Sequence, residues 1–207
     1  MSKDDEFFAE FQRAIEEHLA SLNSRPNAEI DNLSPKDMHA ILYNPFGEDS
    51  PIGYRQEIKE DVLDNVPFLV LIEALLAEIK SAKEVKLTGT GSLPRKLCLS
   101  LYAREILKEE AIETGIVKLA KEGDSLVLQS MKYVALLSGV IKKRRNKISL
   151  TKKGQALLDK SKRYELLKLL FQSHFQKFNF GYFDGYSDET SLQSLFGYTM
   201  YLLLKYG

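Results

Sequence analysis

The sequence predicts a mainly α-helical protein that contains one small β-hairpin. Apolar residues recur every three or four positions over most of the chain, which is the spacing of amphipathic helices. Residues 140–150 instead form two short strand-like runs on either side of Arg145-Asn146, a pair suited to a tight turn. With 207 residues, 44% of them hydrophobic, the chain is long enough for one large domain or two small ones.

Residues 1–60 are predicted to form an acidic, helical N-terminal extension. Its first helix, over 4–22, carries glutamates on its polar faces and an apolar stripe made of Phe7, Phe8, Phe11, Ile15 and Leu19. A second, shorter helix is expected to begin at Ser34, whose hydroxyl suits the N-cap, because Pro35 then takes the first helical position. Asn44-Pro45 should end this helix, since the residue before a proline avoids helical geometry.

Residues 61–160 are predicted to form a central domain. Its expected elements are a helix over 61–81, a short strand over 85–88, helices over 92–105 and 125–138, strands over 140–144 and 147–150, and a helix over 152–160. Gly139 fits the left-handed position that commonly ends a helix, and Thr151 fits the N-cap of the helix after the hairpin.

This order of elements and the residues around the hairpin resemble bacterial transcription regulators of the winged helix-turn-helix class, such as the MarR-like and PadR-like families. In those families a helix ends in glycine, and an apolar strand, a charged wing, a Leu-Thr pair and a Lys-Gly pair follow. The matching segments are Leu137 to Ile141 (LSGVI), Lys142 to Lys147, and Ile148 to Gly154 (ISLTKKG). The resemblance is close from Leu126 to Lys160 and implies that helix 125–138 is a DNA recognition helix. Winged helices also serve as protein–protein modules.

The charges are segregated along the chain although they sum to zero. Residues 1–66 hold 15 acidic and 6 basic side chains, a net charge of −9. Residues 142–163 hold 10 basic side chains and one acidic side chain, a net charge of +9. Clustered cations favour an anionic partner. Duplex DNA is one candidate, and the acidic N-terminal region of the same protein is another.

The candidate DNA-binding residues lie on the expected recognition helix and on the wing. Gln129 can pair with adenine, and Lys132 can reach guanine or phosphate. The wing cations suit contacts with phosphates or with the minor groove, although alternate residues of a strand face opposite ways. The predicted set is Gln129, Lys132, Lys142, Lys143, Arg144, Arg145, Lys147, Lys152 and Lys153.

Two alternatives remain for the basic wing. Its charges can simply protect an exposed sheet edge from pairing with other strands. The protein can also be a protein-interaction module whose wing is covered by its acidic N-terminal region or by a partner chain.

The sequence offers no constellation for catalysis, a cofactor or a metal, so we expect a non-enzymatic protein. The histidines His18, His39 and His174 lack metal-ligand spacing. Gly89-Thr-Gly91 is not followed by the Lys-Ser/Thr pair of a phosphate-binding loop, and we interpret it as a strand-to-helix turn. Cys98 is the single cysteine, and its apolar helical surroundings predict a buried thiol rather than a nucleophile.

Residues 161–207 are predicted to form a C-terminal helical pair, over 164–178 and 189–205. The aromatic segment between them, 178–186, is expected to pack on neighbouring helices, with base stacking or the lining of a ligand pocket as the alternative. The last helix is apolar enough to join a core or to bind another protein or a second copy. The chain has no run of 18 apolar residues and begins with an acidic stretch, which predicts a cytoplasmic protein without a membrane partner.

Overall fold

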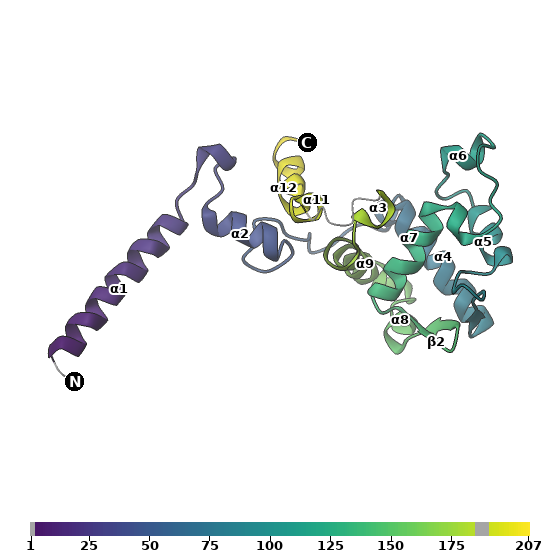
Figure 1. Cartoon of the computed structure of the whole chain (residues 1–207), viewed down its shortest axis with the longest axis horizontal. Helices are drawn as coiled ribbons and strands as arrows, with labels where there is room; N and C mark the ends of the chain where they lie inside the picture. The colour runs from purple at the N-terminus through teal and green to yellow at the C-terminus, as the bar shows by residue number, and fades with distance from the viewer. Residues whose placement is uncertain (1–2, 185–190) are drawn as a thin grey trace. The chain divides into compact units, whose positions relative to one another are not determined.

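The computed structural model describes residues 3–184 and 191–207, which are mainly helical and include one three-stranded antiparallel sheet (Figure 1). This result confirms the mainly α-helical class. The chain divides into two compact units, Met1–Tyr54 with Thr190–Gly207, and Arg55–Glu189. Among the described residues, no helix combines the length and the apolar character that crossing a bilayer requires.

The first unit has a small core between its second helix and its last. Its helices are α1 (Lys3–Asn23), α2 (Pro35–Tyr43), α11 (Ser191–Ser194) and α12 (Phe196–Tyr206), with a 3-10 turn at Ala28–Ile30. The Ser34 hydroxyl accepts the N–H of Asp37 at 3.1 Å, so α2 has the N-cap that the sequence predicts. Helix α12 packs on α2 at Gly197, where an added Cβ would lie 2.5 Å from the carbonyl oxygen of Ile41.

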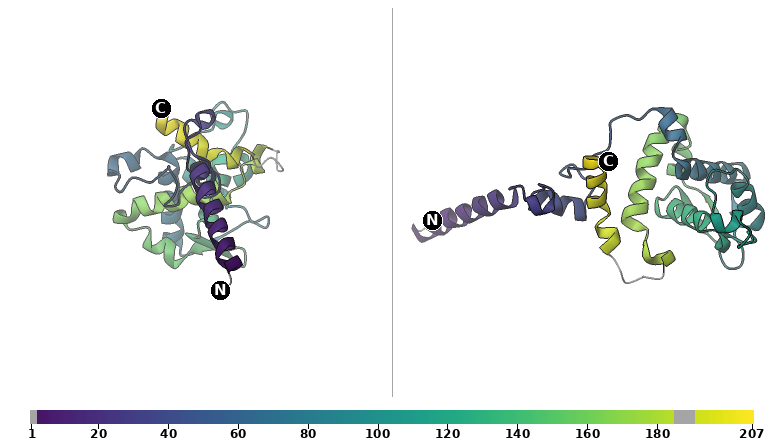
Figure 2. Two further views of the ribbon diagram at one scale, coloured as in Figure 1. Left: turned by 90° about the vertical axis from the view of Figure 1, so that its left-hand side faces the viewer. Right: turned by 90° about the horizontal axis from the view of Figure 1, so that it is seen from above.

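Helix α1 is a single rod that leads towards α2 (Figure 2). The apolar face of this helix is open to solvent. Phe7, Phe8 and Phe11 keep 65%, 67% and 58% of their surface exposed. Ile15 and Leu19 continue the same stripe and are also exposed. A contiguous exposed apolar face of this kind often marks an interaction surface.

The second unit is built around α4, which is buried along most of its length. Its helices are α3 (Glu60–Asp64), α4 (Pro67–Ala82), α5 (Arg95–Tyr102), α6 (Glu110–Glu113), α7 (Leu126–Leu137), α8 (Lys152–Ala156), α9 (Arg163–Lys177) and α10 (Gly181–Asp184), with 3-10 turns at Glu122–Asp124 and Lys160–Lys162. Ile72, Leu75 and Leu76 of α4 are fully buried. Met131 and Val134 of α7 pack into the same core. Helix α9 belongs to this second unit, whereas α12 belongs to the first unit.

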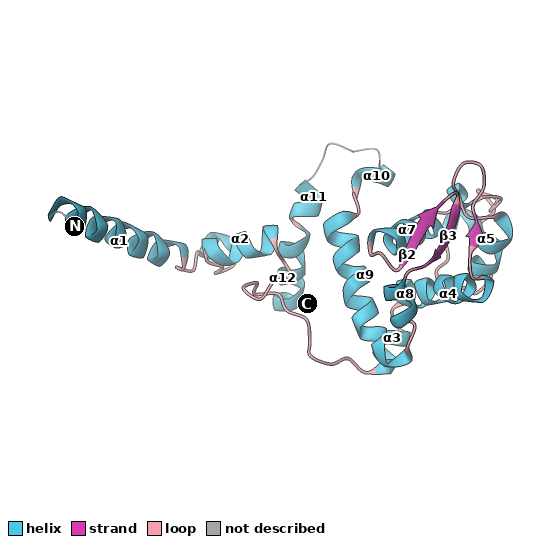
Figure 3. Ribbon diagram, turned by 90° about the horizontal axis from the view of Figure 1, so that it is seen from below, coloured by secondary structure: helices cyan, strands magenta, loops and turns pink. Residues whose placement is uncertain are grey.

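Three strands lie side by side along one side of this core (Figure 3). They are β1 (Val85–Lys86), β2 (Ile141–Arg144) and β3 (Lys147–Leu150), in the order β1-β3-β2. The side chains of Ile141, Ile148 and Leu150 are buried and define the inner face of the sheet. Arg145 and Asn146 join β2 to β3 with φ angles of 48° and 58°, which confirms the tight turn.

Proline explains the main difference from the predicted helices. The helix expected over 61–81 is two helices, because Pro67 has no N–H and holds Val66 in an extended conformation with φ −103° and ψ 90°. The helix expected over 92–105 likewise begins only after Pro94. The helix expected over 152–160 ends already at Ala156, four residues short of the expected end.

Two stretches between the expected helices contain short helices. Helix α6 lies within residues 109–123. Helix α10 lies within the aromatic segment 178–186, of which residues 185–186 lie outside the described residues.

Contacts of Thr151 and Gly154 explain the Leu-Thr-Lys-Lys-Gly sequence that joins β3 to α8. The Thr151 hydroxyl donates to the carbonyl oxygen of Gly139 at 2.7 Å and accepts the N–H of Gly154 at 2.9 Å. A Cβ added to Gly154 would lie 2.0 Å from the carbonyl oxygen of Val140. Glycine therefore allows α8 to pack against the chain that enters β2.

We predict that Gly154→Ala lowers the free energy of unfolding by about 2 kcal/mol or more, because the added methyl group meets backbone that cannot move aside cheaply. Chemical denaturation followed by circular dichroism measures this change. The exposed neighbour provides a matched control, since Gln155→Ala should change stability by less than about 0.5 kcal/mol. Equal stability of the two variants would contradict the packing argument.

Candidate nucleic-acid interface

The outer face of the three-stranded sheet carries a cluster of cations. Residues directly opposite each other in a sheet point to the same face, and successive residues alternate. The register pairs Arg144 with Lys147 and Lys147 with Lys86, and it pairs Lys142 with Ser149. We call Lys86, Lys142, Arg144 and Lys147 the outer-face cations. All four side chains are exposed.

One carboxylate partly neutralises this cluster. Lys147 forms an ion pair with Glu84, and both side chains are about half exposed. This contact relieves the repulsion of Lys147 by the like charges directly opposite it in both neighbouring strands. Within the described residues, no carboxylate forms an ion pair with Lys86, Lys142 or Arg144.

The tip of the hairpin is tied to the segment that follows β1. The Asn146 side-chain amide donates to the carbonyl oxygens of Leu87 at 3.2 Å and Thr88 at 2.8 Å. The N–H of Leu87 donates in return to the carbonyl oxygen of Asn146 at 2.9 Å. The neighbouring turn residue, Arg145, is exposed. The tip is thus held in place while it presents a further cation.

Lys143 does not join the outer-face cations. It lies opposite Ile148 and so on the inner side of the sheet. Its ammonium group lies against Gly91, where an added Cβ would be 2.8 Å from Nζ. The sequence had placed Lys142 to Arg145 in one candidate set, and the structure separates Lys143 from its neighbours.

Lys132 of α7 is buried in an internal ion pair. Its side chain is 6% exposed, and Nζ lies 2.5 Å from a carboxylate oxygen of Glu122. The ammonium group also donates to the carbonyl oxygen of Gly91 at 3.2 Å, and the other carboxylate oxygen of Glu122 accepts the N–H of Leu93 at 2.5 Å. These partners satisfy the charge internally, so Lys132 is not presented to a DNA groove.

Gln129 is the other residue predicted on α7. Its side chain is half-buried, and its amide lies 3.3 Å from the carbonyl oxygen of Gly123 and 3.4 Å from that of Ser125. The large exposed side chains of this helix are Leu126 and Leu137, which are apolar. Helix α7 therefore presents no basic surface of the kind that groove-reading helices use.

Lys152 and Lys153 complete the predicted set. Both are exposed in the first turn of α8, which starts directly after β3. Sequence reasoning missed Lys86, because β1 is only two residues long and its pairing with β3 spans about sixty residues of chain. The alternation in Val85-Lys86-Leu87 is the one local signal that could have indicated it.

Cys98 is buried, as its apolar helical surroundings predict. The side chain is fully buried, and burial raises the pKa of the thiol to about 11, so the sulfur stays protonated at neutral pH. In the described part of the chain, no three His, Cys, Asp or Glu side chains gather into a group that could hold a metal ion.

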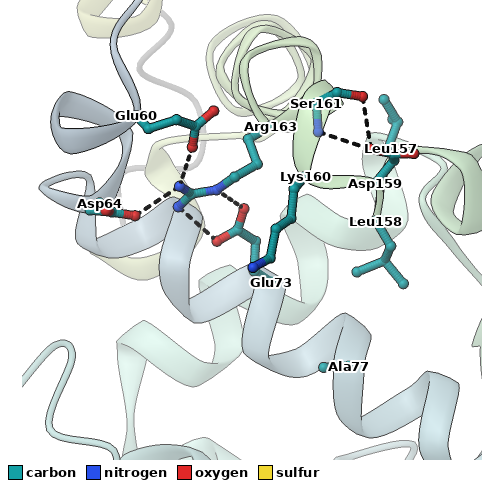
Figure 4. Close-up of a pocket in the computed structure, with 10 residues that line it drawn as sticks. All are labelled: Glu60, Asp64, Glu73, Ala77, Leu157, Leu158, Asp159, Lys160, Ser161 and Arg163. Carbon is teal, nitrogen blue, oxygen red and sulfur yellow. Dashed lines mark hydrogen bonds and ion pairs between the residues drawn. The ribbon is translucent and has the colours of Figure 1, made fainter.

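A cavity of about 760 Å³ is lined by a cluster of charged side chains that pair with one another (Figure 4). Arg163 of α9 donates from Nε and Nη2 to Glu73 at 2.7 and 3.1 Å. Its Nη1 donates to Glu60 at 2.7 Å and to Asp64 at 2.8 Å. The hydrogen bonds with Glu73 contribute most to raising the pKa of the guanidinium. The cluster joins α3, α4 and α9, and we assign it to stability.

Comparison of the chain with protein-family models, with curated proteins and with solved structures finds no match.

We predict that Lys132→Ala lowers the free energy of unfolding by about 3 kcal/mol or more, because it leaves the Glu122 carboxylate buried without its cation. Gln129→Ala, one turn earlier, is the matched control and should cost less than about 1 kcal/mol. Urea denaturation measures both values. If the pair explanation holds, Lys132→Met combined with Glu122→Gln should recover most of the loss. Similar stabilities for Lys132→Ala and Gln129→Ala would contradict it.

Proposed function

We propose that this protein is a non-enzymatic winged-helix protein that binds duplex DNA through the outer face of its basic wing, in a regulatory role. The observation that carries the proposal is the row of outer-face cations, which stands beside the exposed Arg145 and near a single paired carboxylate, Glu84. DNA carries closely spaced phosphates, and lysine and arginine side chains that neutralise these phosphates release the counterions condensed on the DNA.

The arrangement of the second unit supports the winged-helix assignment. A helix (α4), a short strand (β1), three further helices (α5, the four-residue α6, and α7) and a hairpin (β2 and β3) come in this order along the chain, and the first strand pairs with the last. In a winged helix the hairpin is the wing. The tie between Asn146 and the segment after β1 favours a wing that is ordered before it meets DNA.

The proposed contact is with the phosphate backbone rather than with base edges. Lys132, which a recognition helix would use, is paired internally with Glu122. Backbone contacts position a protein on DNA but carry little sequence information. We therefore expect weak discrimination between DNA sequences by this module alone.

The alternative is a protein-interaction module whose basic wing is covered by the acidic N-terminal region or by a partner chain. The exposed apolar face of α1 favours this alternative, since the described residues leave Phe7, Phe8 and Phe11 open to solvent. It predicts that the intact chain does not bind DNA.

We predict that the full chain binds a labelled random-sequence duplex and that binding weakens steeply with salt. About four phosphate contacts, from Lys86, Lys142, Arg144 and Arg145, would give a slope of log K against log salt of roughly −3 to −4. Fluorescence anisotropy across a series of salt concentrations measures it.

Lys142→Glu combined with Arg144→Glu should weaken binding at least ~100-fold, because two attractive contacts become repulsive. The matched control is Lys36→Glu with Lys59→Glu, which changes the net charge equally at exposed residues that are not part of the sheet. Equal losses in the two double variants would show that only net charge matters. Absence of binding by the unmodified chain would favour the protein-interaction alternative.

A further inference from the structure

Two segments that take no part in the proposed DNA contact lie against helix α7. One is the loop Thr88–Ser92, and the other is the stretch Phe178–Tyr182. The loop lines a cavity of about 150 Å³, and the aromatic stretch lines a groove of about 280 Å³. Tyr133 and Leu136 of α7 line both, so the cavity and the groove adjoin each other along one turn of the helix.

The cavity is polar and has an excess of positive charge. Lys143 points into it from the inner side of β2, with Nζ against Gly91. Lys132 and Glu122 also line it, but their charges cancel in the 2.5 Å ion pair. Lys143 is therefore its uncompensated cation, and we find no carboxylate paired with this lysine among the described residues.

Hydroxyl groups stand beside that cation. The Thr90 hydroxyl lies 3.0 Å from that of Thr88 and 3.3 Å from that of Ser92. Gly91 has a φ of 81°, and its lack of a Cβ leaves room for the lysine ammonium group. A phosphate offers three strong acceptor oxygens and negative charge, so it suits the ammonium group, and the hydroxyls of Thr90 and Ser92, which line the cavity, can donate to it in place of their hydrogen bond with each other.

The groove beside the cavity is mainly apolar and aromatic. Leu136, Leu137 and Phe178 line it together with Tyr133 and Tyr182. The two tyrosine rings meet edge to face with centroids 5.4 Å apart, and their hydroxyls lie 3.3 Å apart. Such a surface suits a planar ring, because every nucleobase has a π-face that can stack on aromatic side chains.

Tyr133 links the two parts without adding negative charge. The ammonium group of Lys132 lies 4.8 Å from the centre of its ring. The hydrogen bond with Tyr182 is the largest cause of a rise in the pKa of Tyr133 to about 12, so the phenol is neutral at physiological pH. Because Tyr133 and Leu136 line both the cavity and the groove, a single ligand can occupy the two together.

We propose that this face of α7 binds a nucleoside monophosphate, with the phosphate held by Lys143 and the hydroxyls of loop Thr88–Ser92, and the base held in the groove beside Tyr182. The site uses the inner side of the sheet, whereas the proposed DNA contact uses its outer face. It therefore does not depend on DNA binding, and its ligand is a small molecule.

Isothermal titration calorimetry of the full chain with AMP tests the proposal, with inorganic phosphate and adenosine as separate titrants. We expect AMP to bind at least tenfold more tightly than either fragment. Lys143→Ala should weaken AMP binding at least tenfold. Lys142→Ala, the adjacent lysine on the opposite face of the sheet, is the matched control and should leave AMP binding unchanged.

A second variant, Tyr182→Ala, tests the aromatic groove of the site. Tyr182→Ala should weaken AMP binding but leave the binding of inorganic phosphate unchanged, and Tyr43→Ala, at an exposed tyrosine of the first unit, should change neither. Absence of AMP binding at millimolar concentration would overturn the proposal. Equal affinity for AMP and inorganic phosphate would overturn the assignment of the groove to the base.

The DNA-binding proposal can be tested independently of the AMP proposal. Lys142→Glu with Arg144→Glu should retain AMP binding and lose DNA binding. Lys143→Ala should lose AMP binding and retain DNA binding. Loss of AMP binding in both variants would contradict the separation of the two faces.

Discussion

The buried pair of Lys132 and Glu122 is the interaction on which the second unit depends. It joins α7 to the 3-10 turn at Glu122–Asp124, and its two partners also reach the backbone of Gly91 and Leu93. The segment Gly91–Leu93 is thereby fixed to α7 and to the turn that directly precedes this helix. A charge taken out of water must be compensated where it lies, so the pair tolerates little displacement of any of the three.

That pair also decides what the surface of the unit offers. It removes the cation that a groove-reading helix would need, and it leaves the outer sheet face as the strongest basic surface near the hairpin. The same pair positions the loop Thr88–Ser92 against α7 and so shapes the cavity into which Lys143 points. The cations of the hairpin region thus have two kinds of surroundings, the outer face of the sheet and this cavity.

Local signals in the sequence were enough to predict the elements around the hairpin. Gly139 has a φ of 71° where a helix ends, and the Thr151 side chain caps α8, as each residue type indicates. These features depend on a few neighbouring residues, which is why they can be read from the chain. Pro67 was an equally local signal for a helix start, but the long apolar stripe around it masked the break.

The candidate sites depended on contacts that no local pattern contains. Lys132 resembles an exposed basic residue until the turn at Glu122–Asp124 brings a carboxylate to it. Lys86 joins the outer-face cations only because β1 pairs with β3 across the intervening helices. The two faces of β2 follow from strand alternation, yet which face meets the core depends on how the sheet packs on α4.

The burial of Cys98 gives the second unit an internal reporter of its own opening. The thiol is enclosed by core side chains, and its high pKa keeps the reactive thiolate rare. A thiol-modifying reagent can therefore reach the sulfur only during transient unfolding around α5. Because the chain has one cysteine, the rate of labelling at that single atom follows the population of opened molecules without any engineered probe.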